Sequence, residues 1–583
     1  MLRVKEIYIK NFRSIQDEHF PLPALTVLVG KNDVGKSNLL EAVKICLEGT
    51  ATSVDSEDFY DLSSPIEIRT VFEGVSGYLD LCDERNRPKI QQRLDRDGCL
   101  TVRRLAAGPK KLGEIEVLDP SSGEFSTPTG IDAALKPVLP EVIFIEALAD
   151  VAEETKGTQK DALGMLVNQV MAGIVKQVEP TLKEAYKQAD KLLNVQNSVE
   201  GARDERASEL VAIESEITQY VKETFPGASV RLRVQLASAK EILERVHVLV
   251  REGKNEDPYY RRGHGLQRTL YLSLLRALAA RIRRGQEQAI VRPFILLFEE
   301  PEAFLHPEGQ IKMRGALGAI STGAQVILAT HSPLMVTPDS LSRTIRVEKC
   351  VKADHPKPVT RRFGPVNPEE LSVPQRQLLP LFAIQRSSRF LFARGVLLVE
   401  GVGDEHIFAG ISEQLRGFCL EANEIAIVEA GGKANLATFA EILRTLGLEV
   451  WILTDIDFLW EGAGHLLGGD ADHARFMERL QQLVPAPAGG IRDDDARHRD
   501  KLQRIQTCVG QLLAERDTLC EKLLASGVFV LRHGEMEDYI GLGRHSKSQY
   551  LKAANELRSG TRTINHQEDF LRLLDALGAW AAG

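Results

Sequence analysis

The spacing of apolar positions changes along the chain and divides it into four parts. Up to residue 150, short apolar runs between turn residues predict strands, with one helix after residue 37. From 151 to 225, apolar residues recur every four positions and form a stripe along each of two long helices. Strands and helices alternate again over 226–390, and a compact α/β unit follows over 391–583. The pattern predicts an α/β protein with a helical insertion. The stripe must be buried, either within the chain or against a second subunit.

Residues 30–37 fit the phosphate-binding pattern G-x-x-x-x-G-K-[ST] between a predicted buried strand (25–29) and a predicted helix. The glycines let backbone N–H groups and a helix N-terminus point at phosphate. Lys36 would reach the β- and γ-phosphates of ATP, and the Ser37 hydroxyl would bind Mg²⁺. The residues expected to contact the nucleotide here are Asn32, Gly35, Lys36, Ser37 and Asn38.

A second set of polar residues ends two later buried runs. Glu299 and Glu300 follow the run 294–298, where carboxylates at the end of a parallel strand face the phosphate crevice. We expect Glu299 to bind Mg²⁺ and Glu300 to orient the attacking water, although a helix cap would explain one of the acids. His331 follows the run 326–329 and would lie near the γ-phosphate.

The composition limits the classes of partner and compartment. The net charge of −9 argues against a broadly basic surface, so contact with DNA needs a local basic channel or bound metal ions. The seven cysteines are scattered, without the spacing of a zinc site or a disulfide framework, which favours a reducing cytoplasm. No apolar run is long enough to span a membrane, so no membrane association is expected.

Carboxylates end two of three consecutive predicted βα units in the last part of the chain. Glu400 follows the apolar run 395–399, and Asp455 and Asp457 follow the run 449–454, while a Gly-Gly-Lys turn (431–433) ends the strand in between. Because parallel strands end at one edge of a sheet, these acids and Asp404 should meet there. Hard oxygen ligands suit two ions of Mg²⁺ or Mn²⁺, which can clamp a phosphoryl displacement.

The first half of the chain resembles the ATP-binding-cassette superfamily, in the branch of structural-maintenance and RecF-like ATPases. The strand leading to residues 11–13, the phosphate-binding loop, the paired acids and His331 match in type and order. The resemblance implies that Gly263, Gly265 and Gln267 form a signature loop that contacts ATP across a homodimer or higher oligomer. The chain departs from that superfamily in lacking a Ser-Gly-Gly signature and in having Glu in place of Asp at 299.

The last part resembles the TOPRIM domain of topoisomerases, primases and certain nucleases. This resemblance implies that Glu400 is a metal ligand or general acid/base and that Asp455 and Asp457 are metal ligands. Asp404 and Glu405 resemble the extra acids of the nuclease branch, and Glu537, in an acidic turn that enters a helix, is a further candidate ligand. Lys547 or Lys552 could neutralise the transition-state phosphate, or each could be a solvated helical lysine.

The order of these parts resembles the OLD (overcoming lysogenization defect) family over essentially the whole chain. The resemblance implies an ATP-linked, metal-dependent DNA endonuclease, active in phage defence or DNA processing. One class of this family works beside a UvrD-like helicase, as the Gabija nuclease subunit does. Two alternatives remain: a non-nucleolytic repair clamp whose TOPRIM domain only binds DNA, and a topoisomerase, which would need a nucleophilic tyrosine.

Overall fold

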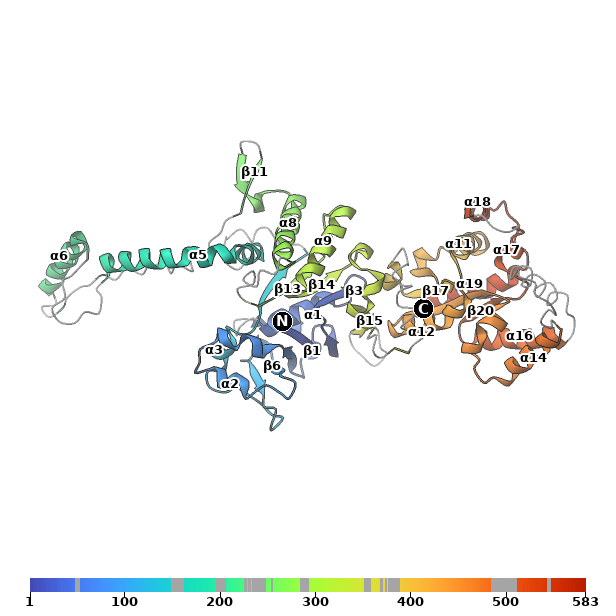
Figure 1. Cartoon of the computed structure of the whole chain (residues 1–583), viewed down its shortest axis with the longest axis horizontal. Helices are drawn as coiled ribbons and strands as arrows, with labels where there is room; N and C mark the ends of the chain where they lie inside the picture. The colour runs from blue at the N-terminus through green and yellow to red at the C-terminus, as the bar shows by residue number, and fades with distance from the viewer. Residues whose placement is uncertain are drawn as a thin grey trace. The chain divides into compact units, whose positions relative to one another are not determined.

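The chain is described here by a computed structural model (Figure 1). Its described residues are 1–47, 53–147, 162–194, 206–224, 228, 232, 248–252, 255–283, 293–350, 358–366, 371–372, 375, 388–483, 511–542 and 547–582. They form two compact units: Met1–Phe12, Leu22–Leu25 and Leu39–Ala329 in the first, and Arg13–Pro21, Thr26–Asn38 and Thr330–Gly583 in the second. The domain boundaries predicted at residues 150 and 225 fall outside the described residues and stay predictions.

The first unit contains an antiparallel sheet with one buried face. Its neighbouring strands are β1 (Arg3–Phe12), β5 (Ile66–Glu73), β6 (Leu100–Ala106), β8 (Glu116–Leu118) and β9 (Phe125–Ser126). In β6 every second residue is buried, as expected for a sheet with one solvated face. One of these inward residues is Arg104, which donates to the backbone oxygens of Cys46 (2.8 Å) and Gly113 (3.0 Å) and is thereby satisfied despite its burial. The short elements of this region are α2 (Arg87–Gln91), α3 (Ile131–Leu135), β4 (Ser53–Val54) and β7 (Lys110–Lys111).

The same unit contains three adjacent parallel strands: β10 (Glu141–Ile145), β13 (Phe294–Glu299) and β14 (Gln325–Thr330). β13 and β14 are apolar along almost their whole length because both faces of such a sheet are covered. The helices α8 (His264–Arg283) and α9 (Pro307–Ile320) pack against each other beside them. Gln325 is fully buried, and its amide bonds the backbone of Val4 and Leu22 at 2.7–3.0 Å.

The predicted helical insertion is present as α5 (Ala162–Leu193) and α6 (Ser208–Thr224) (Figure 1). The start of α5 packs against α8 and β10, where Leu166 and Val167 are buried. Farther along, Val178 is 37% exposed, Leu192 is 53% exposed and Ile213 of α6 is 48% exposed. Among the stripe residues whose side chains are described, only Leu166, in the first turns of α5, is fully buried. A two-stranded ribbon, β11 (Leu249–Glu252) and β12 (Asn255–Pro258), leads into α8.

In the second unit, β3 (Leu25–Val29) runs parallel to β15 (Thr344–Cys350), and β15 pairs antiparallel with β16 (Val359–Phe363). β2 (Ile15–Pro21) lies beside β16. The loop after β3 leads into α1 (Lys36–Leu47), which confirms the predicted order of strand, loop and helix.

The C-terminal part of the second unit is a parallel sheet in the order β18 (Ile425–Glu429), β17 (Gly395–Val399), β19 (Glu449–Asp455) and β20 (Val528–Leu531). Side chains from one face of the sheet, such as Leu397 and Leu453, form a core with α11 (Val402–Arg416), α18 (Lys547–Arg558) and α19 (Gln567–Ala582). α12 (Lys433–Thr445) packs on β17 and β19. The remaining helices are α13 (Phe458–Glu461), α14 (Ala471–Leu483), α16 (Gln511–Leu524) and α17 (Met536–Tyr539).

These strands and helices confirm the predicted α/β class. No helix within the described ranges is long and apolar enough to cross a membrane. The cysteines of these ranges are free thiols, which agrees with the expectation of a protein without a disulfide framework.

Candidate active site

Three acidic side chains converge at the carboxyl edge of the C-terminal sheet. Glu400 directly follows β17, Asp455 is the last residue of β19, and Asp457 lies two residues later. One carboxylate oxygen from each lies within 4.8 Å of the others. They meet because β17 and β19 are adjacent and parallel, so their carboxyl ends share one edge. We call these three residues the acidic cluster.

Neighbouring groups orient the carboxylates of the acidic cluster. The Thr454 hydroxyl donates to Glu400 Oε1 at 2.7 Å. The backbone N–H of Met536, from the segment after β20, donates to Asp455 Oδ1 at 3.0 Å. The start of α17, which follows β20, therefore contributes a backbone group to the site. No side-chain motif could have predicted that contact.

Burial and repulsion between neighbouring carboxylates disfavour the ionised form of the acids in the acidic cluster. Burial raises the pKa of Asp455 well above its usual value, and the charges of Glu400, Asp404 and Glu537 raise it further. The pKa of Glu400 is also raised by burial, against the lowering effect of Lys433. Burial, with the charges of Glu400 and Glu537, raises the pKa of Asp404 to about 7. Crowded carboxylates of this kind gain from a bound cation. A set made only of oxygen donors fits Mg²⁺ or Mn²⁺.

Lys433 supplies the positive charge at the acidic cluster. Its ammonium group pairs with fully buried Asp457 and lies 3.9 Å from Glu400 and 3.7 Å from Glu461. It is the first residue of α12, after a glycine pair with positive φ. Lys433 is not among the predicted site residues, although the Gly-Gly-Lys turn at the end of a parallel strand is the signal that marks it.

Of the two lysines proposed from the sequence, only Lys552 has a described side chain, and it is not grouped with the acidic cluster. Lys552 is 77% exposed and lies 3.8 Å from Glu556 one turn away on α18. Lys547 begins α18, and its side chain lies outside the described residues. The structure thus offers Lys433 as the cation next to the acids.

The other predicted acidic ligands lie at different places. Asp404 accepts from the backbone N–H of Gly401 at 2.9 Å at the start of α11, and its charge reaches the acidic cluster. Glu537 in α17 accepts from the Tyr550 hydroxyl at 2.7 Å and also raises the pKa of Asp455. The pKa of Glu405 is raised by burial, and its charged neighbours are His406, Glu429, Glu421 and Arg389. Glu405 is therefore not grouped with the acidic cluster.

The phosphate-binding loop has the backbone that its glycines allow. Gly30 and Gly35 have φ of +148° and +104°. A Cβ at Gly35 would lie 2.3 Å from the Thr360 hydroxyl, so only glycine fits there. The Lys36 ammonium is nearly buried and donates to the backbone oxygens of Gly30 (3.0 Å) and Lys31 (2.6 Å). The Asn38 amide donates to the Ser14 hydroxyl at 2.7 Å.

A cavity of about 400 Å³ lies beside the phosphate-binding loop, within the second unit. It is lined by residues 30–34 of the loop, 346–349 of β15 and 391–394 before β17. An ion pair joins Lys31 to Glu424, and Lys349 binds Asp33 at 2.7 Å. Ion pairs therefore connect the loop to Glu424, directly before β18, and to Lys349 in β15.

The remaining predicted nucleotide residues follow strands or begin a helix. Glu299 ends β13, and Glu300 adopts a left-handed backbone (φ 46°) while its N–H donates to Ala329 O at 2.9 Å. His331 follows the last residue of β14 directly. These positions are the ones expected for groups at the carboxyl edge of a parallel sheet.

The predicted signature loop lies at the start of α8. Gly263 precedes the helix, and Gly265 and Gln267 lie in its first turns, where the Gln267 amide donates to Arg262 O at 2.7 Å. A Cβ at either glycine would meet no described atom within 4 Å. Packing within the described chain does not require glycine at these two positions. The open space next to them would let another molecule approach the backbone closely.

Two protein-family models match different parts of the chain. Residues 2–129 and 139–336 match the AAA ATPase domain family, and residues 391–457 match the TOPRIM domain described as overcoming lysogenization defect protein-like. The Old nuclease of Escherichia phage P2 is 26% identical, covering 98% of this chain and 99% of that protein. The OLD nuclease of Thermus scotoductus is 24% identical, covering 98% and 97%. Endonuclease GajA of Bacillus cereus is 25% identical, covering 89% and 88%.

Other matches are partial or distant. A RecF protein of Desulforamulus reducens is 35% identical over 57 residues, 10% of this chain. The Smc head domain of Pyrococcus furiosus aligns at 16% identity with a TM-score of 0.35, covering 62% of this chain and 97% of that structure. The near full-length matches confirm the resemblance drawn from the motifs. This chain belongs to the AAA ATPase domain family and joins that ATPase to a TOPRIM domain of the OLD type.

Proposed function

We propose that this protein is an ATP-binding, divalent-metal-dependent DNA endonuclease that acts in phage defence or DNA processing. The observation that carries the proposal is the convergence of Glu400, Asp455 and Asp457 within 4.8 Å at one sheet edge. The names of the near full-length relatives, Old nuclease and endonuclease GajA, support the nuclease activity. The RecF matches cover too little of the chain to favour a repair clamp.

The acidic cluster would hold Mg²⁺ or Mn²⁺, with Asp404 and Glu537 as further ligands. Two such ions, when bound, stabilise the attacking and leaving oxygens of a phosphodiester displacement. Thr454 and the Met536 N–H keep the carboxylates oriented toward one another. Lys433, paired with Asp457, balances the charge of the acids and is placed to attract a DNA phosphate once that pair opens.

ATP would bind at the phosphate-binding loop. There Lys36 would exchange its two backbone acceptors for phosphate oxygens, and Ser37 and Glu299 would hold Mg²⁺. In this proposal Glu300 orients the attacking water and His331 contacts the γ-phosphate end. Gly263, Gly265 and Gln267 would contact the nucleotide of a second copy, which the open space around the two glycines supports.

The helical insertion would help to join the two copies. The exposed apolar residues Val178, Leu192 and Ile213 along α5 and α6 support a subunit contact there. The UvrD-like helicase partner and the cytoplasmic location rest on the sequence resemblance and composition, and they stay part of the proposal.

Cleavage of supercoiled plasmid DNA tests the nuclease function. With Mg²⁺ or Mn²⁺ present, the protein should nick or linearise the plasmid, and Asp455→Asn should abolish this. The asparagine keeps an oxygen acceptor for the Met536 N–H and removes only the negative charge that a metal ion needs. The matched control is Asp575→Asn, because Asp575 is a 64% exposed acid paired with Arg416 on the surface of the same domain.

Three results would decide against the proposal. Retention of the plasmid without strand breaks would favour the non-nucleolytic clamp. Equal cleavage by Asp455→Asn and the unaltered protein would place the activity elsewhere. Cleavage that persists without divalent ions in the presence of a chelator would exclude a metal-dependent reaction. Repeating the assay with and without ATP, and with Lys36→Ala, shows whether the nucleotide activates or restrains cleavage.

A further inference from the structure

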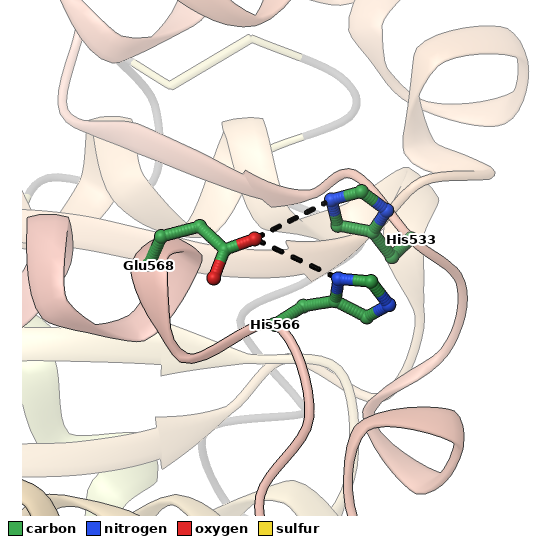
Figure 2. Close-up of side chains that lie close together, drawn as sticks. All are labelled: His533, His566 and Glu568. Carbon is green, nitrogen blue, oxygen red and sulfur yellow. Dashed lines mark ion pairs between the residues drawn. The ribbon is translucent and has the colours of Figure 1, made fainter.

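Two histidines and a glutamate gather outside the acidic cluster, at the end of β20. His533 lies two residues after this strand, His566 immediately precedes α19, and Glu568 lies in the first turn of α19. Figure 2 shows both imidazole rings turned toward the Glu568 carboxylate. Glu568 Oε1 lies 3.8 Å from His533 Nε2 and 3.6 Å from His566 Nδ1, and one ligand atom from each residue lies within 4.8 Å of the others. We call these residues the histidine cluster.

The distances suit coordination better than direct hydrogen bonding. Hydrogen bonds between nitrogen and oxygen span about 2.7–3.2 Å, so both contacts are too long. Ligands about 2.0–2.2 Å from a tetrahedral Zn²⁺ lie roughly 3.3–3.5 Å from one another. The two rings lie in nearly parallel planes, so binding one ion requires one imidazole to rotate out of the stack and turn its nitrogen toward the Glu568 carboxylate.

The charge state of the histidines also suits a metal ligand. The two rings stack at 3.8 Å between centroids with 11° between their planes, where two imidazolium cations would repel each other. Neutral imidazole is the form that binds a metal ion.

The surrounding structure holds the histidine cluster in place. Asp569, next to Glu568, accepts from the backbone N–H of Arg532 at 3.0 Å and from the Tyr539 hydroxyl. The same hydroxyl accepts from the backbone N–H of His533 at 3.0 Å. His566 has a left-handed backbone (φ 48°), which is uncommon for residues other than glycine but is adopted more often by asparagine, aspartate and histidine. The backbone that carries the two rings is thus held by partly buried polar contacts.

We propose that His533, His566 and Glu568 form a binding site for one Zn²⁺ ion, with a water molecule as the fourth ligand. Two imidazoles and a carboxylate are a ligand set that zinc uses, whereas Mg²⁺ prefers oxygen ligands alone. The side chains are 36%, 50% and 65% exposed, so an ion and its water can reach them from solvent.

The ion would have a positioning role. It would join the end of β20 to the start of α19, and the segment between His533 and Tyr539 contains the Met536 N–H that binds Asp455. That segment also contains Glu537, whose charge acts on Asp455. A zinc ion at the histidine cluster would therefore hold this side of the acidic cluster in place.

Zinc binding to the tag-free, full-length protein tests the site without reference to cleavage. The protein is stripped with a chelator, and Zn²⁺ is titrated against a chromophoric chelator in excess Mg²⁺, which occupies oxygen-only sites. We expect one Zn²⁺ per chain, bound at least about tenfold more weakly in His566→Asn and in Glu568→Gln, because losing a direct ligand should cost at least as much as losing a group that hydrogen-bonds a ligand. Asparagine tolerates the left-handed backbone of residue 566, so this variant should fold.

A matched control and a second readout separate the histidine cluster from other binding. His465→Asn changes an exposed histidine elsewhere in the domain and should bind zinc like the unaltered protein. Zn²⁺ should raise the thermal unfolding midpoint of the unaltered protein and of His465→Asn, but not of His566→Asn. Equal zinc affinity in all of these proteins, or loss of zinc only in Asp455→Asn, would overturn the proposal.

Discussion

At the scale of single residues, the acidic cluster depends on Lys433 as much as on its acids. Its ammonium group is the positive charge that pairs with Asp457 and lies near Glu400. Removing one partner of a buried pair leaves the other without compensation, which costs about 3–5 kcal/mol. A bound divalent cation would supply that compensation instead.

Lys433→Met should therefore make stability dependent on divalent ions. Without them, the thermal unfolding midpoint should fall, and added Mg²⁺ should restore more of it than in the unaltered protein. Differential scanning fluorimetry with and without Mg²⁺ measures both effects. Lys552→Met is the matched control, because Lys552 is 77% exposed, and it should change neither value. An equal response of the two variants to Mg²⁺ would contradict the role given to Lys433.

Gly35 is a second residue whose replacement should disturb a binding site, because the phosphate-binding loop has no room for a Cβ at this position. Gly35→Ala places a Cβ 2.3 Å from the Thr360 hydroxyl at a φ of +104°. Backbone strain of this kind costs about 1–3 kcal/mol before the clash is counted. We expect binding of a fluorescent ATP analogue to weaken at least tenfold. Gly77→Ala introduces the same methyl group where the described chain leaves open space, so it should bind the analogue normally.

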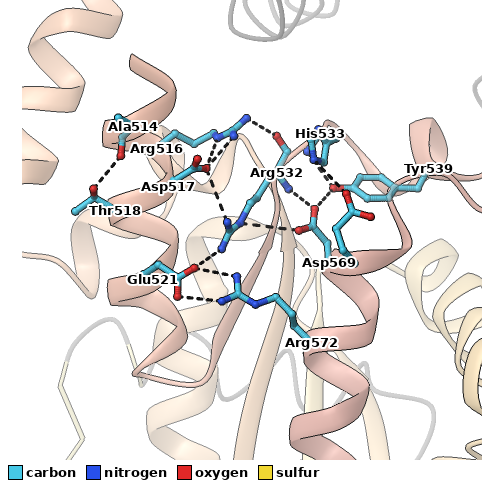
Figure 3. A network of polar contacts seen from close by, with 11 residues as sticks. Ala514, Arg516, Asp517, Thr518, Glu521, Arg532, His533, Tyr539, Asp569 and Arg572 are labelled. Carbon is cyan, nitrogen blue, oxygen red and sulfur yellow. Dashed lines mark hydrogen bonds and ion pairs between the residues drawn. The ribbon is translucent and has the colours of Figure 1, made fainter. Parts of the chain in front are cut away.

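At the scale of elements, a charged network joins α16, β20 and α19 (Figure 3). Glu521 of α16 accepts from Arg532 at 2.7 Å and from Arg572 at 2.9 and 3.1 Å. Arg516 donates to Asp517 at 2.8 Å and to Arg532 O at 3.1 Å. The network holds α16 and α19 to the strand whose following segment reaches the acidic cluster.

The acid stability of this network follows from Glu521. Hydrogen bonds from Arg572 and Arg532 lower the pKa of Glu521 to about 2. Because the folded pKa is below the unfolded one, the stabilisation is present above about pH 4.5 and is lost as the pH falls toward 2. Half of this side chain is exposed, so solvent screening limits the gain to about 1 kcal/mol or less.

Glu521→Gln should thus lower stability at pH 7, and the difference from the unaltered protein should vanish near pH 2–3. Urea unfolding followed by circular dichroism over this pH range measures it. Glu413→Gln, which removes a single exposed pair with Arg558, should have a smaller effect. A difference that grows on acidification would contradict the assignment.

At the scale of the whole molecule, Arg346 links β15 of the ATPase part to the TOPRIM part within the second unit. It is 2% exposed and donates to the backbone oxygens of Leu446 (3.1 Å), Gly447 (3.1 Å) and Ala393 (2.9 Å). Burial lowers the pKa of Arg346, and Glu348 opposes this change. The guanidinium keeps its charge in proteins, and these hydrogen bonds compensate its burial.

Arg346→Met should leave three backbone acceptors without this donor, at about 1–3 kcal/mol each where they stay buried. We expect earlier thermal unfolding and faster proteolysis between the two parts of the chain. Limited digestion with a glutamate-specific protease, whose sites neither variant changes, followed by mass spectrometry locates the cleavage. Arg361→Met, at an exposed position on the adjacent strand β16, should digest like the unaltered protein. Equal cleavage rates in the two variants would remove the linking role of Arg346.

Much of the molecule could be predicted because its signals are local. The order of strand, glycine loop and helix around Lys36 follows from neighbouring residues, as do the apolar runs that become β13, β17 and β19. The meeting of Glu400, Asp455 and Asp457 also followed, since parallel strands end at one edge. The family was recognisable for the same reason, because its motifs are short and retain their order.

The amino-acid sequence alone determined the fold class, the family and the acids at the ends of β17 and β19, because the residues next to each strand in the chain set them. Only the tertiary structure decided that Lys433 pairs with the acids, that the Met536 N–H reaches Asp455, and that His533 meets His566 and Glu568. These contacts join segments up to 81 residues apart, and neither spacing nor periodicity specifies which side chains packing will bring together.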